Sequence, residues 1–140
     1  MLVNCSSQLN PIERATAEVY ENCNKADSCY FNLKEFTDFE WDTVYFIEAV
    51  GNLEAINQII GCYYDGYREG TEPIIFKKGG KIIHFENNTY EIESNKNGSI
   101  SVSDSSYEKS YVYTPETAFF RVEKVIVSEG KFYILHHVIP

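Results

Sequence analysis

Apolar residues recur at helical spacing in two stretches of the first half of the chain. The first follows Asn10 and Pro11, which suit the N-cap and the first helical position, and it predicts a helix that ends near Asn24. The second lies between Asn52, a suitable cap, and Gly61, a suitable stop, and it predicts a short helix. The apolar positions behind these two predictions are Ile12, Ala15, Val19, Cys23, Leu53, Ile56 and Ile60.

The other apolar residues form short runs or alternate with polar residues, which is typical of β-strands. Turns that contain glycine predict hairpins between several of these runs. Because the helices precede a series of hairpins, we expect an α+β fold with a mostly antiparallel sheet, a hairpin-rich C-terminal half and two N-terminal-half helices packed on one face. The expected strands are 30–33, 43–50 and 107–113, and the expected hairpins join 74–76 to 82–85, 90–92 to 100–102, and 118–127 to 132–139.

The length and charge of the chain narrow the choice of function. With 140 residues the chain has the usual size of one domain, which we place at 10–140, after a flexible N-terminal segment at 1–9. It has 12 Lys and Arg against 21 Asp and Glu, a net charge of −9. Such a surface repels phosphates and anionic lipids, so binding to nucleic acid or directly to a membrane surface is not expected. Steering toward a basic protein and plain solubility are the two explanations of the charge.

The cysteines bear on the cellular compartment. The run from Leu2 to Ser7 resembles the end of a bacterial lipoprotein signal, with Cys5 as the residue that would take the lipid and tether segment 1–9 to a membrane. Cys23 and Cys29 flank a short polar turn and would form a disulfide in an exported protein, whereas in the cytosol they would stay reduced. We therefore expect the cell envelope or periplasm, with the cytoplasm as the alternative.

Sequence patterns that signal catalysis are missing. The chain has no G-x-S-x-G, no dinucleotide-binding or phosphate-binding glycine loop, and no C-x-x-C. The three histidines lack metal-ligand spacing, and the adjacent His136 and His137 would point to opposite faces of a strand. His84 and Glu86 would share a strand face. We expect no enzyme activity, no cofactor and no metal.

Two acidic segments are candidates for binding a partner. In the first, Asp38, Glu40 and Asp42 alternate with Phe39 and Trp41, so an extended backbone would place the acids on one face and the aromatics on the other. Three explanations apply to this strip: a solvated strand edge, a docking strip for a basic protein, and a carboxylate cluster for catalysis or Ca²⁺. The second segment is a tyrosine-rich loop, expected to be exposed, whose candidate partner-binding residues are Tyr64, Asp65, Tyr67 and Glu69.

The stretch from Leu33 to Phe46 contains the pattern Phe-x-Trp-Asp-x-Val-Tyr, from Phe39 to Tyr45. In this stretch the chain resembles small uncharacterised bacterial lipoproteins and exported proteins. The resemblance implies export and a similar fold, and it implies no particular activity.

Small size, acidity, exposed tyrosines and the lack of catalytic patterns favour a protein-binding role. The most concrete hypothesis is an immunity protein that neutralises a bacterial toxin, since toxins that cut nucleic acid tend to be basic and opposite charge speeds capture. The alternative is an envelope lipoprotein with a structural or accessory role, tethered through Cys5.

Overall fold

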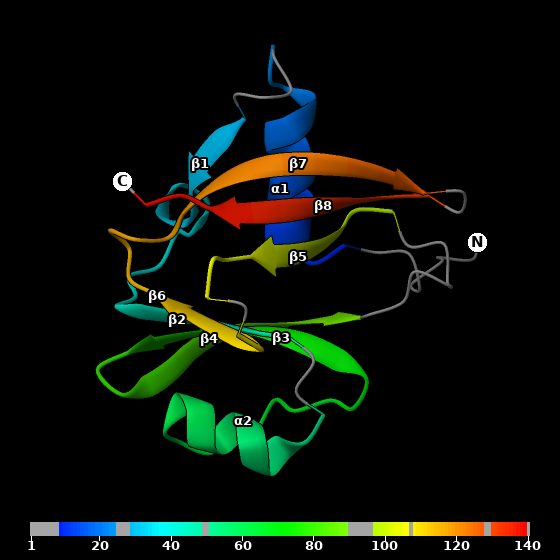
Figure 1. Ribbon diagram of the computed structural model, residues 1–140. Helices are drawn as coiled ribbons and strands as arrows, with labels where there is room; N and C mark the ends of the chain where they lie inside the picture. Colours follow the sequence, from blue (N-terminus) through cyan, green and yellow to red (C-terminus); the bar gives the residue numbers. More distant parts are fainter. Residues whose placement is uncertain are drawn as a thin grey trace, which may run out of the picture.

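Two α-helices and eight strands form the part of the chain that the computed structural model describes, namely residues 9–24, 29–48, 51–89, 97–106, 108–127 and 130–139 (Figure 1). In chain order the elements are α1 (Pro11–Glu21), β1 (Tyr30–Asn32), the 3-10 helix η3 (Leu33–Phe36), β2 (Thr43–Ile47), α2 (Leu53–Ile60), β3 (Thr71–Lys78), β4 (Lys81–Thr89), β5 (Ser99–Ser103), β6 (Ser110–Tyr113), β7 (Phe119–Val127) and β8 (Gly130–His137). The expected α+β class is confirmed, because six of the eight strands follow α2.

Both expected helices form, and capping residues stand at the start of each; α1 ends at Glu21, with Asn22 as its C-cap, before the expected end near Asn24. The Asn10 N–H donates to Oε1 of Glu13 at 3.0 Å in front of α1. At the start of α2, Oδ1 of Asn52 accepts from the Ala55 N–H at 2.8 Å. Gly61 ends α2 in the left-handed conformation with φ 77°, which a residue without Cβ adopts without strain.

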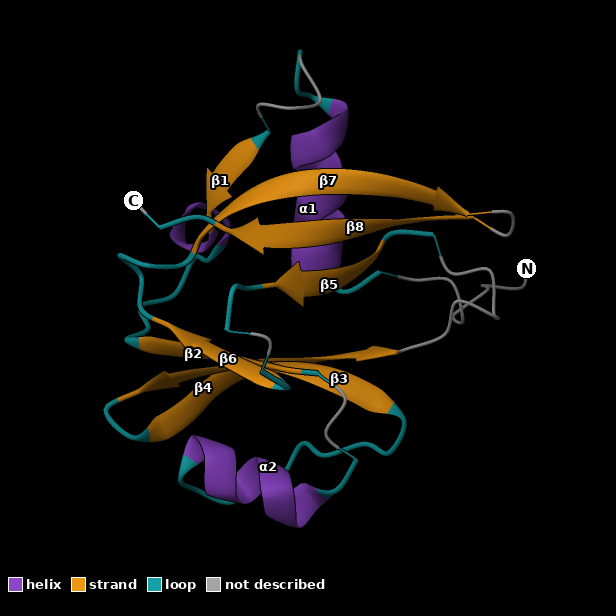
Figure 2. Cartoon of the chain, in the orientation of Figure 1, coloured by secondary structure: helices purple, strands orange, loops and turns teal. Residues whose placement is uncertain are grey.

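The strands divide between two four-stranded sheets. Sheet A has the order β1-β7-β8-β5 and sheet B the order β4-β3-β2-β6. Helix α1 packs on sheet A through β7 and β5, whereas α2 packs on sheet B, and Figure 2 shows them behind sheet A and below sheet B respectively. The sequence led us to expect both helices on the face of one sheet, and this expectation is wrong. Each helix packs its apolar face against an apolar surface of a different sheet.

The central strands of sheet B are buried on both faces. Val44 and Phe46 of β2 face a core shared with sheet A and α1. Ile47 and its neighbour Ile75 of β3 face a second, smaller core that α2 closes. Side chains of successive strand residues point to opposite faces, so sheet B connects the two cores.

Two of the three expected hairpins are present, and the third lies partly outside the described residues. β3 pairs with β4 around Gly79 and Gly80, and β7 pairs with β8. The third hairpin was expected at Asn97-Gly98, but the strand that follows this turn, β5, pairs in parallel with β8. Its first half, 90–92, lies outside the described residues. A turn dipeptide indicates a local reversal, whereas the partner of a strand is decided by residues far away in the chain.

Candidate functional site

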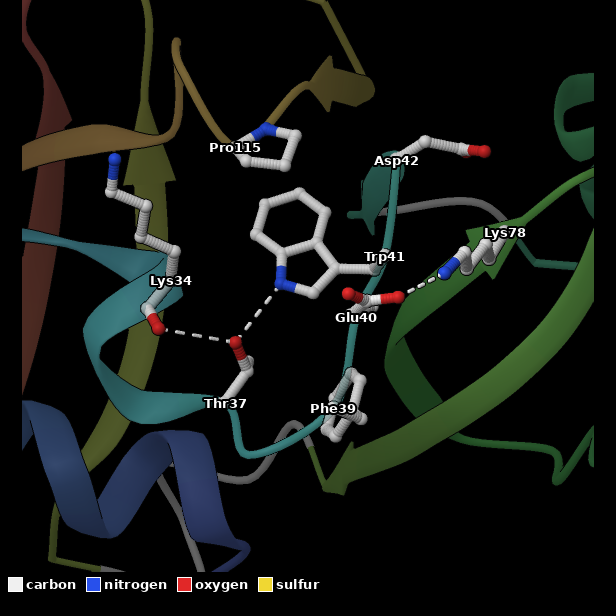
Figure 3. Close-up of a pocket in the computed structure, with 8 residues that line it drawn as sticks. All are labelled: Lys34, Thr37, Phe39, Glu40, Trp41, Asp42, Lys78 and Pro115. Atoms are coloured by element: carbon white, nitrogen blue, oxygen red, sulfur yellow. Dashed lines mark hydrogen bonds and ion pairs between the residues drawn. The ribbon is translucent and has the colours of Figure 1, made fainter.

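An open groove of about 410 Å³ lies beside the first acidic segment. Side chains from the segment after η3, from the end of β3 and from the turn after β6 surround it, as Figure 3 shows. The lining residues are Lys34, Thr37, Phe39, Glu40, Trp41, Asp42, Lys78 and Pro115. The groove thus combines aromatic surface with charged side chains of both signs.

Trp41 fixes the position of the segment from Thr37 to Asp42. Its side chain is almost fully buried, with 7% exposed, and its ring packs edge-on against Phe76 at 5.3 Å. The indole Nε1–H donates to Oγ1 of Thr37 at 3.0 Å, as the dashed line in Figure 3 marks. Phe39 packs on Phe76 and on the His84 ring of β4, with ring centroids 5.1 and 4.8 Å away. The aromatic residues therefore hold this segment against the end of sheet B.

The acids of this segment point to solvent, which confirms the predicted alternation. Asp38, Glu40 and Asp42 are exposed, while Phe39 is half-buried. Two of the acids also tie the segment to the β3–β4 turn. Oδ2 of Asp42 accepts from the Gly79 N–H at 2.8 Å, and Glu40 forms an ion pair with Lys78.

Both contacts hold the carboxyl groups in the charged form. The Gly79 N–H, followed by the Thr43 hydroxyl, lowers the pKa of Asp42 below its usual range. The hydrogen bond and charge of Lys78 lower the pKa of Glu40. These contacts therefore favour the charged form of both carboxyl groups.

The second predicted segment divides into buried and exposed residues. Tyr64 was expected on the surface, but it is fully buried, and its hydroxyl donates to Oδ1 of Asn87 at 2.5 Å. Burial raises the pKa of this hydroxyl. Tyr67 is half-buried, whereas Asp65 and Glu69 are exposed. The expected exposure of Tyr64 is thus wrong, because α2 and β4 enclose the ring.

Strand β4 separates the two segments. Asp42 contacts Gly79 at the β3–β4 turn, whereas Gly66 accepts a hydrogen bond from Nδ2 of Asn87. The two segments also contact opposite faces of β4, through Phe39 on His84 and through Tyr64 on Phe85. The acids of the two segments therefore do not form one continuous patch around the groove.

Glu86 connects β4 to the first turn of α1. Its side chain is buried, Oε1 accepts from the Ile12 N–H at 2.9 Å, and Oε2 lies 2.9 Å from Nε2 of His84. A carboxylate at this end of a helix is stabilised by the helix dipole and by the unpaired N–H groups. The predicted shared face of His84 and Glu86 is confirmed, and its role is structural.

A second carboxylate joins the two sheets, and sequence reasoning missed it. Glu48 follows β2, and its Oε2 accepts from the Val102 N–H of β5 at 2.8 Å. Burial raises the pKa of Glu48 to about 7. No local pattern marks this residue, because its partner lies far away in the sequence.

The C-terminal histidines also serve the framework. Nε2 of His136 lies 2.7 Å from Oε1 of Glu123, while His137 contacts the Thr117 carbonyl oxygen at 2.8 Å and Asp104 at 3.4 Å. The two rings thus have separate partners, as the strand alternation predicted. Within the described ranges, no group of three or more Asp, Glu, His and Cys side chains is placed to hold a metal ion.

Cys23 and Cys29 are joined in a disulfide, with Cα atoms 5.7 Å apart, and Cys62 is a free thiol. Cys5, the predicted lipid attachment site, lies outside the described residues. No described helix is long and apolar enough to span a bilayer.

Searches of family models, curated proteins and solved structures match nothing to this chain. The groove and the charge of the chain are therefore the features that bear on its function.

Proposed function

We propose that the protein is a non-enzymatic binding protein that captures a basic protein partner at the groove beside Asp38, Glu40 and Asp42. The most concrete partner is a nuclease-type bacterial toxin domain, which this chain would neutralise as an immunity protein. The observation that supports the proposal best is the placement of exposed carboxylates beside aromatic surface in the groove. The net charge of −9 adds long-range attraction for a basic surface.

The groove acids are available to a partner despite their internal contacts. The Glu40 side chain is 86% exposed, and an ion pair as exposed as Glu40–Lys78 is screened by water and contributes little to stability. An arginine of the partner can therefore replace Lys78 and form two parallel hydrogen bonds with the carboxylate. Occlusion of the toxin's active cleft by this acidic surface would block access of nucleic acid.

Charge reversal at two pairs of acids tests the proposal. The groove variant carries Asp38→Lys and Glu40→Lys, and the matched control carries Asp65→Lys and Glu69→Lys, which changes the net charge by the same amount. The probe is the protein encoded by the gene immediately upstream, and the readouts are its Kd for this chain and the inhibition of its nuclease activity. We expect the groove variant to bind about 10- to 100-fold more weakly, as for close charge pairs at interfaces, and the control to change Kd less than about threefold.

Equal effects of the two variants would show that binding depends only on the net charge of the chain, and would refute the groove as the binding site. Lack of binding by the wild-type chain would refute the immunity role.

A role in the cell envelope is the second candidate. The Cys23–Cys29 disulfide favours it, because such bonds persist in oxidising compartments. We propose a structural or accessory lipoprotein in this case, tethered by a lipid on Cys5. Mass spectrometry of the protein isolated from its host tests this, since acylation at Cys5 adds the mass of the fatty acyl chains.

A further inference from the structure

Strand β4 forms one edge of sheet B, and it is long and partly apolar for an edge strand. It has nine residues, Lys81–Thr89, and among the described strands only β3 pairs with it. Two of its apolar residues, Ile83 and Phe85, are 41% and 39% exposed. Edge strands usually end early or have charged residues that prevent the pairing of another chain. β4 has Lys81 at its start, a register shift that leaves Ile83 without a partner in β3, and the buried Glu86, so the position between them, Phe85, is the one to consider for such pairing.

The hydrogen-bond pattern of sheet B shows which backbone groups of β4 point outward. The Glu48 N–H donates to the Lys109 carbonyl oxygen at 2.7 Å, so the even-numbered residues of β2 bond to β6 and the odd-numbered residues bond to β3. Tyr45 lies opposite Ile75, and Ile75 lies opposite Phe85. Ile75 therefore bonds to β2, and the N–H and C=O of Phe85 point away from β3.

A contact at Asn87 agrees with this assignment. Asn87 lies two residues after Phe85, so its backbone groups point the same way. Its carbonyl oxygen accepts a hydrogen bond from Nδ2 of Asn10, which lies outside the sheet, at 2.9 Å. At Phe85 no described residue provides such a contact. The N–H and C=O of Phe85 thus form an open pairing position in the middle of the edge.

The two acidic segments lie on opposite faces of β4 at this position. On one face, Phe39 contacts the His84 ring, and the exposed Asp38 and Glu40 are its chain neighbours. On the other face, the Tyr64 ring packs edge-on against Phe85 at 5.3 Å. The chain neighbours of Tyr64 are the exposed Tyr63, with 67% of its surface accessible, and Asp65.

We propose that the edge of β4 at Phe85 binds an extended segment of a basic partner as an additional strand of sheet B. The inference rests on the proposed function in taking the partner to be basic. Side chains of an added strand alternate between faces, so lysines or arginines on one face would meet Asp38 and Glu40. Apolar side chains on the other face would meet Tyr63 and Phe85. A second copy of this chain is disfavoured as the occupant, because each copy has a net charge of −9.

The experiment uses synthetic peptides of about nine residues, the length of β4, and the wild-type chain. The first peptide alternates valine and lysine, the second has proline at its centre, and the third has glutamate in place of lysine. The readouts are Kd from titration and the hydrogen exchange rate of the Phe85 amide by NMR. We expect the valine–lysine peptide to bind and to slow exchange at Phe85 at least about tenfold, while the other two peptides do neither.

Binding of the valine–lysine peptide without protection of Phe85 would overturn the proposal, as would lack of binding. Protection of Phe85 in a dimer of the chain alone would overturn it in favour of self-association. The variant with Asp38→Lys and Glu40→Lys separates this inference from the proposed function. If this variant still binds the peptide with protection at Phe85, strand addition is supported and the role of Asp38 and Glu40 in binding is refuted. If the wild-type chain binds the basic protein without protection at Phe85, the proposed function stands and strand addition is refuted.

Discussion

The Glu48 carboxyl group at the junction of the two sheets makes stability depend on pH near neutrality. It accepts a hydrogen bond from the Val102 N–H at 2.8 Å, and the Ser101 hydroxyl lies 3.5 Å away. Burial raises its pKa from 4.5 to about 7, and the nearby charge of Glu72 acts in the same direction, while the two hydrogen bonds act against it. Above this pH the folded protein must accommodate a half-buried negative charge that has no cationic partner among its described contacts.

The sign and size of the effect follow from linkage. The folded state holds the proton of Glu48 to higher pH than the unfolded chain does, so this contribution to stability is complete below about pH 4.5 and is lost as the pH rises through 7. Each unit of pKa difference between the two states corresponds to about 1.4 kcal/mol, which sets an upper value of about 3 kcal/mol. Partial access of water to the side chain reduces this, and we expect about 1–3 kcal/mol.

Replacement Glu48→Gln removes the titration and keeps an acceptor for the Val102 N–H. At about pH 8 the variant should be more stable than the wild type by about 1–3 kcal/mol, and at about pH 4.5 the two should agree within about 0.5 kcal/mol. Urea unfolding followed by circular dichroism measures both values. The control is Glu116→Gln, which neutralises an exposed carboxylate. A variant whose stability follows the wild-type pH dependence, or which is less stable at pH 8, would refute the reasoning.

Three further changes test other contacts of the framework by the same unfolding measurement. Glu86→Ala should lower the free energy of unfolding by about 2–3 kcal/mol, because it leaves an N–H of the first turn of α1 without its buried charged acceptor. The double change Cys23→Ser and Cys29→Ser should lower it by about 2 kcal/mol, the value expected for a short disulfide loop, and reducing agent should then have no further effect. Gly66→Ala should lower it by about 1 kcal/mol, because the added methyl group would overlap the Phe85 ring.

For each of these three changes, a second variant or condition gives a result that would contradict the stated cause. Glu86→Gln keeps an acceptor for α1 and should cost less than the alanine variant, and an equal cost would contradict the role of the acceptor. Reducing agent that still destabilises the double serine variant would contradict the Cys23–Cys29 pairing. Gly51→Ala meets open space and should leave stability nearly unchanged, so an equal loss at both glycines would contradict the overlap with Phe85.

Much of the local structure could be predicted from the sequence. Asn52 and Gly61 define the ends of α2 because capping depends on residues within one helical turn. The alternation at 38–42 predicted exposed acids and inward aromatics, since neighbouring side chains of an extended backbone point to opposite sides. In the candidate site, the sequence thus identified the acids, and the structure added Lys34, Lys78 and Pro115 as the residues that complete the groove.

Only the tertiary structure decided how these elements combine. The parallel pairing of β5 with β8, the burial of Tyr64 and the contact of Glu48 with Val102 all join residues that are far apart in the chain. Periodicity and turn residues are local signals, and they describe which face of a segment is apolar without naming its partner. The sequence by itself therefore determined the α+β class, the start of each helix, the end of α2 and the acidic character of the protein. The partition into two sheets, the edge position of β4 and the half-buried carboxylate between the sheets depended on long-range packing, which brings together groups that no local pattern relates.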